Sequence, residues 1–487
     1  MGDRPTSTPT IPVVEACPVG RQSWAEPLFP PARRSSLPWP LLVCGYTGGF
    51  VLVVVLALAR QSGLPATGTL WAEDGVIFYS QAVAHSVLHT LVASYNGYGQ
   101  LVPRLAVQLT GLGPLRDVPT TVALSGAVGL ALVSCLVFHM ARGLITSPAL
   151  RALLVASMVL LPLAVVEMLD NLVNLPWWIF FAAFWALLWR PSGPGGRAVA
   201  AVVCLLAAAS EPLVGLLMPL ALVRAVALPR WRENAASVGL AFGLVYQLAV
   251  VLGAHGERSF SRTGVTSIPA ALGARVGLGW LTGLRATDAI VRWDRPVAEV
   301  VGGVIFLAIL VAGLKLGDRR VRALTVTVAV LAPLCFAVPV WLRGAGPYMQ
   351  TAKSVGYAGR YAATPMLMLI SLVLVLAGHL SAGRGHTGPA GQHGRGAHVR
   401  GGGRRSNVAT ISAVALCCVL LVPGWAADFR DRNGRTKGPA WTSRLPAAVA
   451  ECRSFPRPRL VAVMIDPPVD HVVMTCQALV QKAAEDN

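Results

Sequence analysis

Charged residues are scarce in this chain. Asp, Glu, Lys and Arg make up 13% of its 487 residues, whereas hydrophobic residues make up 54%. Soluble globular proteins carry about 25% charged residues, so this composition excludes an ordinary soluble domain. The apolar residues gather in runs, and several runs reach the roughly 20 residues that a helix needs to cross a bilayer. The sequence therefore predicts one integral membrane domain.

Several motifs of soluble proteins are also missing. The basic residues produce a net charge of +19, but they are scattered between apolar runs. They form no helix-turn-helix pattern, zinc spacing or basic stripe interleaved with aromatics, so nucleic acid is not an expected partner. No P-loop is present, and no Rossmann glycine turn follows a strand, which argues against a soluble nucleotide donor. None of the nine cysteines belongs to a CxxC metal motif.

The apolar runs predict an all-α polytopic integral membrane protein with about eleven transmembrane helices. The expected spans lie near 38–59, 118–141, 150–169, 175–189, 197–211, 213–228, 235–253, 297–316, 322–341, 361–381 and 407–424. We expect a disordered cytoplasmic tail over 1–37, a transmembrane domain over 38–424 and a small extracytoplasmic segment over 425–487. Within the domain, the Gly, His and Arg run at 383–405 predicts a disordered basic loop on the cytoplasmic side.

The orientation follows from the Arg and Lys residues of the short connections, because cytoplasmic loops carry an excess of both. An inside amino terminus makes the following residues cytoplasmic: Arg142, Arg151, Arg190, Arg197, Arg230, Arg232, Lys315, Arg319, Arg320 and Arg322. The opposite turns near 170–174 and 211–212 contain no Lys or Arg. We therefore expect a bacterial plasma-membrane protein whose carboxy terminus, after an odd number of spans, lies outside.

Polar side chains gather on the predicted outer side. The first external loop, 61–117, contains Trp71-Ala-Glu-Asp-Gly75, and its stretches 77–95 and 96–112 predict two short interfacial helices. Ionisable groups at the membrane edge are costly and are functional candidates by default. The candidates are Glu73, Asp74, Arg104, Glu167, Asp170, Asn171, Asn174, Glu211, Arg343, Lys353, Arg360 and Tyr361. Acidic, amide and cationic groups on one side suit a substrate with sugar hydroxyls and a phosphate.

Two short motifs carry a family resemblance. With Trp71-Ala-Glu-Asp-Gly75 in the first external loop and Gly359-Arg-Tyr-Ala-Ala-Thr-Pro365 opening a late span, the chain resembles the GT-C superfamily of polytopic glycosyltransferases. The resemblance implies a polyprenyl-phosphate-linked sugar as donor, an envelope glycan or lipid as acceptor, and transfer on the outer face of the membrane. Inverting chemistry is the expected outcome.

The resemblance also implies residue roles. Asp74 is the expected catalytic base with Glu73 in support, although adjacent carboxylates depart from the family's commoner acidic-x-acidic form and leave the choice open. The expected ligands of the donor phosphate are Arg360, Tyr361, Arg343 and Lys353. The expected substrate-binding residues are Arg104, Glu167, Asp170, Asn171, Asn174 and Glu211. No soluble nucleotide is needed. A divalent metal is optional: the acidic pair could bind one, but the sequence shows no full ligand set.

Other interpretations of the same residues stay open. Glu73 and Asp74 are also suited to capping a helix amino terminus, and Arg360 to anchoring a helix at the interface. His85 and His89, four residues apart, would form at most half of a metal site. For the whole chain, the alternative is a transporter or flippase of a lipid-linked or polar substrate. No internal repeat of the kind common in transporters is visible.

The carboxy-terminal segment predicts a small α+β unit. Residues 438–454 predict an amphipathic helix, and 459–468 and 471–479 predict two strands joined at a Pro-Pro turn. Such a unit is too small for a robust core. Cys452 and Cys476 are the two cysteines of this polar segment, and an external location favours a disulfide between them.

Overall fold

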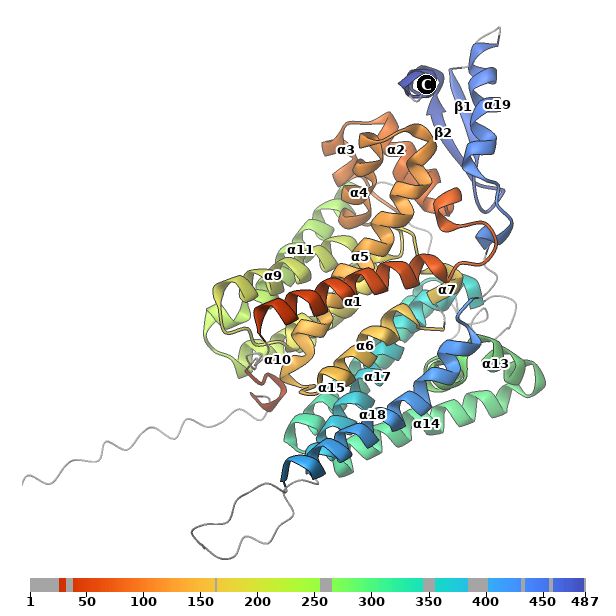
Figure 1. The fold of residues 1–487 in the computed structure, drawn as a ribbon. Helices are drawn as coiled ribbons and strands as arrows, with labels where there is room; N and C mark the ends of the chain where they lie inside the picture. Colours follow the sequence, from red (N-terminus) through yellow and green to blue (C-terminus); the bar gives the residue numbers. More distant parts are fainter. Residues whose placement is uncertain are drawn as a thin grey trace, which may run out of the picture.

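The computed structural model is a predominantly helical bundle with a small α/β unit at one end (Figure 1). It describes residues 26–31, 38–162, 164–254, 265–344, 355–383, 402–430, 434–454 and 459–485. Within these ranges, seven helices are long and apolar enough to cross a membrane. They are α1 (Trp39–Ala59), α5 (Val118–Met140), α11 (Ala235–Gly253), α14 (Arg295–Leu316), α15 (Arg319–Leu342), α17 (Val355–Gly383) and α18 (Gly402–Ala427). The predicted helical multi-pass membrane fold is confirmed at this level.

Four shorter apolar helices fall on the remaining predicted spans. They are α6 (Pro148–Val159), α8 (Leu175–Leu188), α9 (Pro194–Ser210) and α10 (Met218–Ala227). A short helix α7 (Ala164–Glu167) follows α6, and the turn η7 (Pro212–Leu217) precedes α10. Each of the four is shorter than the roughly 20 residues of a full crossing, so the count of eleven spans stays a prediction.

Helix α8 lies at the centre of the bundle, because its sequence is apolar on every side. All of its residues are buried, including Trp178 and Trp185. A helix without a polar face is stable only when it is surrounded by protein or lipid. Close packing elsewhere depends on small residues: a Cβ on Gly239 of α11 would overlap the backbone of Ala201 in α9. Small residues of this kind are common where membrane helices approach closely.

The part of the chain between the predicted spans 235–253 and 297–316 is helical over most of its described residues. It contains α12 (Ser267–Leu272), the π-helical turn η9 (Gly273–Leu278) and α13 (Gly279–Trp293), and residues 255–264 lie outside the described residues. Small residues again explain the packing, since a Cβ on Gly277 would overlap Gly302 of α14.

Residues 61–117, the first loop, contain short helices and turns. The second predicted helix, 96–112, is present as the continuous helix Leu101–Leu112, whereas the first, 77–95, is broken at His85. In chain order the elements of the loop are η2 (Ala66–Gly68), the π-helical turn η3 (Asp74–Tyr79), α2 (Ser80–Ala84), α3 (Val87–Val92), α4 (Leu101–Val107), η4 (Gln108–Leu112) and η5 (Leu115–Asp117). The chain turns sharply at Asn96 and Gly97, which both have positive φ, so Tyr95 and Tyr98 bridge across the turn. Asn and Gly are the residues that adopt this conformation most readily.

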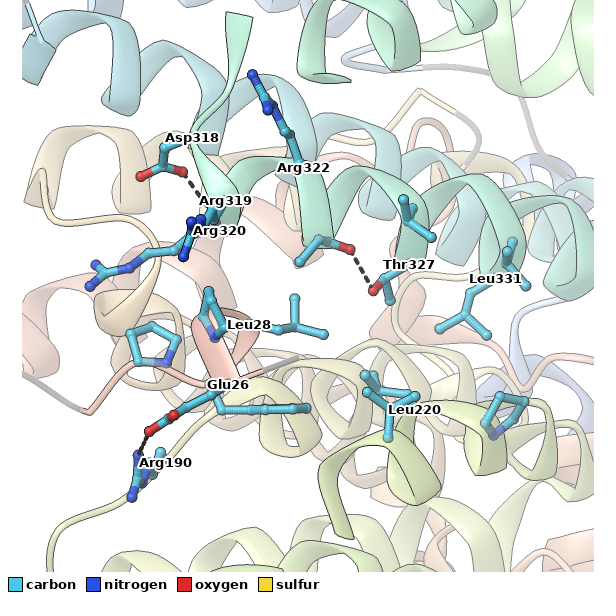
Figure 2. A pocket seen from close by; sticks show the side chains of 18 of the residues that line it. Glu26, Leu28, Arg190, Leu220, Asp318, Arg319, Arg320, Arg322, Thr327 and Leu331 are labelled. Atoms are coloured by element: carbon cyan, nitrogen blue, oxygen red, sulfur yellow. Dashed lines mark hydrogen bonds and ion pairs between the residues drawn. The ribbon is translucent and has the colours of Figure 1, made fainter. Parts of the chain in front are cut away.

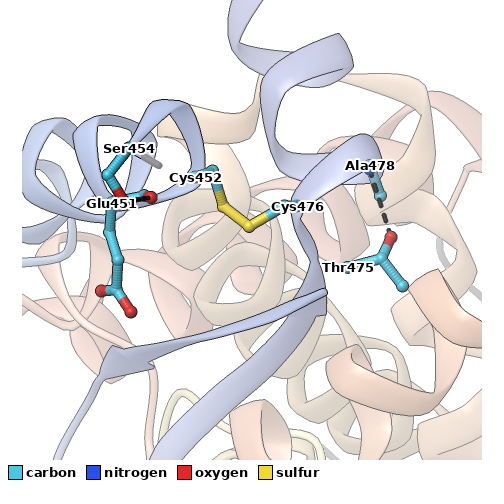
Figure 3. Close-up of a disulfide and its surroundings, with 6 residues drawn as sticks. All are labelled: Glu451, Cys452, Ser454, Thr475, Cys476 and Ala478. Carbon is cyan, nitrogen blue, oxygen red and sulfur yellow. Dashed lines mark hydrogen bonds between the residues drawn. A yellow bond between two sulfur atoms is a disulfide. The ribbon is translucent and has the colours of Figure 1, made fainter. Parts of the chain in front are cut away.

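The carboxy-terminal unit packs on this loop (Figure 1). After the turn η10 (Gly434–Lys437), helix α19 (Trp441–Arg453) precedes strands β1 (Leu460–Met464) and β2 (His471–Thr475), which pair antiparallel. The predicted second strand 471–479 is wrong beyond Thr475, because helix α20 (Cys476–Glu485) begins there. The Thr475 hydroxyl accepts a hydrogen bond from the amide of Ala478, which caps the new helix. A disulfide joins Cys452 of α19 to Cys476 (Figure 3).

Part of the predicted amino-terminal tail is ordered. The turn η1 (Glu26–Leu28) packs against the bundle, and both Leu28 and Phe29 are buried. The apolar pair explains this departure from the predicted disorder of 1–37; residues 1–25 and 32–37 lie outside the described residues. Most of the predicted basic loop 383–405 also lies outside them, between the end of α17 and the start of α18.

Candidate functional site

The Trp71–Gly75 motif is held against the carboxy-terminal unit. Trp71 forms an isolated parallel bridge with Asp466, and the amide of Ala72 donates a 2.6 Å hydrogen bond to the carbonyl of Asp466. Ala72 has φ 38°, an uncommon conformation for a residue with a Cβ. The guanidinium carbon of Arg435 lies 5.1 Å from the centre of the Trp71 ring. The strained turn at Ala72 sets the directions of the two carboxylates that follow it.

Asp74 is directed into the protein. It is completely buried, and its two carboxylate oxygens accept hydrogen bonds from the amides of Leu172 (2.9 Å) and Val173 (2.8 Å). Burial raises the pKa of Asp74 to about 7, against the opposing effect of these amides and of Arg435. Asp74 therefore ties the first loop, residues 61–117, to the turn that precedes α8.

Gly75 allows the carboxy-terminal hairpin to approach the motif. A Cβ at this position would overlap Ile465, and would lie 3.0 Å from a methyl group of Val472. The motif is thus packed on one side by β1 and β2, which positions its turn.

Glu73 faces a cavity of about 400 Å³. The lining comes from the first loop (61–117), the start of α8, η7, α11 and the facing ends of α15 and α17. Its polar and aromatic members are Glu73, Tyr95, Asn96, Tyr98, Gln100, Asn174, Trp177, Glu211, Arg343, Arg360 and Tyr361. Groups from six segments therefore converge on one space at the end of the bundle that carries the carboxy-terminal unit.

Two carboxylates of this cavity are held in place by hydrogen bonds. The Tyr95 hydroxyl donates to Glu73 at 3.1 Å. Burial, reinforced by the Glu73 carboxylate, raises the pKa of Tyr95, so its hydroxyl stays protonated as the donor. Glu211 accepts a 3.2 Å hydrogen bond from the amide of Leu213 at the start of η7. Both carboxylates keep further acceptor capacity for a ligand.

The cationic side of the cavity is formed by Arg343 and Arg360. Nη1 of Arg360 is 2.7 Å from Oε1 of Glu167, which does not itself line the cavity. The Arg360 guanidinium carbon is 5.4 Å from the centre of the Tyr361 ring, and Tyr361 meets Trp177 edge-on at 5.5 Å. Glu167 orients Arg360, and the guanidinium retains other N–H groups for an anion.

The remaining predicted site residues lie outside this lining. Arg104 donates to Gln81 at 2.7 Å and to the carbonyl of Ser94 at 3.1 Å, which stabilises the first loop. Asn171 donates to the carbonyl of Leu169 at 2.9 Å and accepts from the amide of Asn174 at 3.0 Å, so it shapes the turn. Lys353 lies outside the described residues.

Asp170 is a buried residue of that turn with φ 56°. In the described part of the chain, no group donates a hydrogen bond to its carboxylate. Burial raises its pKa to about 6, opposed by the charges of Arg435 and Arg60. The structure therefore brings together Glu73, Asn174, Glu211, Arg343, Arg360 and Tyr361, and places Asp74, Arg104, Glu167, Asp170 and Asn171 around them.

Sequence reasoning missed several contributors to the site, Asn96 and Gln100 among them. Tyr95 and Tyr98 flank an Asn-Gly pair, a turn signal that would have placed both rings side by side. Trp177 lies in the uniformly apolar helix α8, a context that indicates packing rather than a site. Arg435 was not considered: it is buried and donates to the carbonyls of Asp170 (3.1 Å) and Leu169 (3.2 Å). Nothing in its local sequence indicates that contact.

No metal centre is apparent in the described ranges, where no group of three or more His, Cys, Asp or Glu side chains could hold an ion. The rings of His85 and His89 lie 4.5 Å apart, but no third ligand of this kind joins them. Comparisons with protein-family models, curated proteins and solved structures find no match. The chemistry of the cavity is therefore the basis for a function.

Proposed function

We propose that this chain is a membrane glycosyltransferase that moves a sugar from a polyprenyl-phosphate carrier to a glycan or lipid acceptor of a bacterial envelope. One observation carries the proposal: a single cavity collects Glu73 and Glu211, the cations Arg343 and Arg360, and several aromatic rings. Its volume, about 400 Å³, is within the usual range for small-ligand sites. A sugar with a phosphate would use all three kinds of group.

The base in this proposal is Glu73 rather than Asp74. Asp74 is buried, and both of its oxygens are occupied by backbone amides. Glu73 lines the cavity and is oriented by Tyr95. A carboxylate acting as general base must reach the proton that it removes, and of these two neighbours Glu73 is the one that faces the ligand space.

The reaction would proceed by displacement at the anomeric carbon. Glu73 takes the proton from the acceptor hydroxyl while the oxygen of that hydroxyl forms a bond to the anomeric carbon. The bond from the carbon to the phosphate oxygen breaks, and its electron pair leaves with the carrier phosphate. Attack from the face opposite the phosphate inverts the configuration of the sugar.

Arg360 and Arg343 are suited to the leaving phosphate. Negative charge accumulates on that group as the bond breaks, and charge-assisted hydrogen bonds from a guanidinium are stronger than neutral ones. The Glu167 contact holds Arg360 in one orientation before the donor binds. Such preorganised charge lowers the barrier, because little reorganisation is needed during the reaction.

The aromatic rings supply a surface for the sugar. Trp177, Tyr361, Tyr95 and Tyr98 all line the cavity. Apolar and aromatic walls with a few placed polar groups are typical of small-molecule sites. Glu211 and Asn174 line the same cavity. The Glu211 carboxylate would accept hydrogen bonds from sugar hydroxyls, and the Asn174 amide would donate and accept them.

The test is a transfer assay on purified wild type, Glu73→Gln and Asp74→Asn. Each protein receives radiolabelled polyprenyl-phosphate sugars together with membrane lipid and glycan extracts. Wild type should transfer label. Glu73→Gln should lose at least about a hundredfold in rate, because a general base contributes about 10²–10⁴-fold. Carrier binding, measured separately, should survive in Glu73→Gln.

Other outcomes discriminate among the alternatives. Transfer by Glu73→Gln at the wild-type rate would exclude the assigned base. Carrier binding without transfer by any variant, together with movement of the carrier across proteoliposomes by wild type, would replace the proposal with the transporter or flippase.

A further inference from the structure

A second cavity of about 1070 Å³ lies at the opposite end of α15 from Glu73 and Arg343 (Figure 2). Helix α15 begins at Arg319 beside this cavity and ends at Leu342 beside the first one. Helices α10 and α15 form its walls, and η1 lies across one side. It shares no lining residue with the proposed catalytic cavity, so it is a separate site.

The walls of this cavity are apolar over most of their length. Leu220 on α10 faces Leu331 on α15 across the space (Figure 2). Val326 and Val330 also line it and remain about half exposed, at 53% and 49%. Thr327 is the one hydroxyl-bearing residue that lines the cavity, and its hydroxyl donates to the carbonyl of Ala323 at 2.9 Å. The walls thus offer contact area rather than hydrogen bonds.

The end of the cavity at the start of α15 is basic. Arg319, Arg320 and Arg322 line it and are exposed. Two acidic side chains are near: Asp318 caps α15 by accepting from the amides of Arg320 and Val321 at 3.0 Å, and Glu26 lies 3.9 Å from Arg190. Arg190 also pairs with Glu233 at 3.1 Å. The described ion pairs thus leave the three α15 arginines without an acidic partner, and the end keeps an excess of positive charge.

The distance from the basic end to the apolar end matches one leaflet. From Arg319 to Leu331 a helix rises roughly 18 Å, and one leaflet contributes about half of the ~30 Å hydrocarbon core. An amphiphile with its anionic head at the arginines would therefore place its acyl chain along Val326, Val330 and Leu331. The cavity volume is large enough for such a chain.

We propose that this cavity binds one anionic glycerophospholipid from the surrounding membrane. The phosphate head lies among Arg319, Arg320 and Arg322, and an acyl chain lies between α10 and α15. Basic clusters at the membrane surface select anionic lipids over zwitterionic ones. The turn η1 packs at the same end, so lipid binding also supports the ordered part of the amino-terminal segment.

The test uses the full chain, purified in detergent and stripped of lipid. Native mass spectrometry follows titration with phosphatidylglycerol or with phosphatidylcholine. We expect one phosphatidylglycerol to be retained per chain, with an affinity at least about tenfold above that of phosphatidylcholine. Replacement of all three arginines by glutamine should remove this preference. Val330→Trp should weaken retention of both lipids, because the indole fills the apolar end.

Matched controls separate the cavity from general surface charge. Arg230→Gln, Arg232→Gln and Lys315→Gln remove three exposed basic side chains of the same end that do not line the cavity. Retention of phosphatidylglycerol should be unchanged in this variant. If this control lost as much phosphatidylglycerol retention as the variant that replaces Arg319, Arg320 and Arg322, the proposal would be overturned. Equal retention of phosphatidylcholine and phosphatidylglycerol by wild type would overturn it as well.

Two further outcomes would also overturn it. Displacement of the lipid by millimolar glycerol phosphate would mean that the apolar walls add nothing to binding. Failure to retain either lipid would mean that the cavity binds another occupant, such as a second copy of the chain or its own residues 1–25.

Discussion

Glu73 and Asp74 are neighbours in the chain but lie in different environments. Glu73 lines a cavity and accepts a hydrogen bond from the Tyr95 hydroxyl at 3.1 Å, whereas Asp74 is completely buried and accepts two backbone hydrogen bonds from the turn before α8. The positive φ of Ala72 and the packing against β1 and β2 produce this division. One acidic pair therefore supplies a ligand-facing group and a structural anchor.

We expect Asp74→Asn to destabilise the protein. An asparagine can accept from only one of the amides of Leu172 and Val173, because its NH₂ group would face the other. An unsatisfied buried donor costs about 1–3 kcal/mol. The thermal unfolding midpoint of the purified protein should fall. Glu73→Gln, at the partly exposed neighbour, should leave it nearly unchanged, and equal effects of the two substitutions would contradict this assignment.

Gly75→Ala should loosen the contact between the first loop and the carboxy-terminal hairpin. The new methyl group overlaps Ile465, and overpacking of this kind costs about 1–3 kcal/mol. Limited proteolysis of the carboxy-terminal unit measures the effect. Combination with Ile465→Ala should restore part of the protection. Gly45→Ala is the control, because a Cβ there meets nothing within 4 Å.

Loss of the Cys452–Cys476 disulfide should destabilise the carboxy-terminal unit by about 2–4 kcal/mol. In the double Cys→Ser variant, the unit should be cleaved faster by protease than in wild type. Because the carbonyl of Asp466 holds the Ala72 amide, the transfer rate should fall as well. Cys44→Ser, at an exposed free cysteine, should change neither quantity. Equal protease resistance with and without the bridge would rule out this stabilising role.

Asp170 should make stability depend on pH. Burial raises its pKa from 3.8 to about 6, so the folded protein holds a proton that the unfolded chain releases. Its contribution is therefore present below pH 4 and is lost as the pH rises through 6. The unfolding midpoint of wild type should fall over this interval.

Asp170→Asn should reduce that slope without removing it, because Asp466, whose pKa burial also raises to about 6, titrates in the same range. Asparagine tolerates the positive φ of this position, so the turn should be preserved. A pH profile identical to that of wild type would show that Asp170 is not responsible.

Elements with a strong local signal could be predicted from the sequence. The long apolar runs of α1, α14 and α15 contain enough information to predict helices, since no other structure satisfies their backbone groups in lipid. Both strands β1 and β2 lie within the stretches predicted as strands, 459–468 and 471–479, on either side of a Pro-Pro turn. The first loop was predicted less well, because two turns interrupt its apolar periodicity at His85 and Asn96.

The site was predictable in part. The predicted spans place Glu73, Glu211, Arg343 and Arg360 on one side of the bundle. An even number of spans between two residues puts them on the same side, and an odd number puts them on opposite sides. Sequence reasoning could not distinguish a carboxylate that faces a cavity from one that accepts two amides, since the two amides belong to a turn nearly 100 residues further along the chain.

The amino-acid sequence by itself determined the class of protein, the long apolar helices and the chemical groups available at each end. Hydrophobicity and charge are local properties, so they can be evaluated residue by residue. Only the tertiary structure decided the direction of Glu73 and Asp74 and the packing of the carboxy-terminal hairpin on Gly75. It also decided the burial of Leu28 and Phe29 beside the start of α15. These features depend on which distant surfaces meet, and the free energy of burial is defined only after they do.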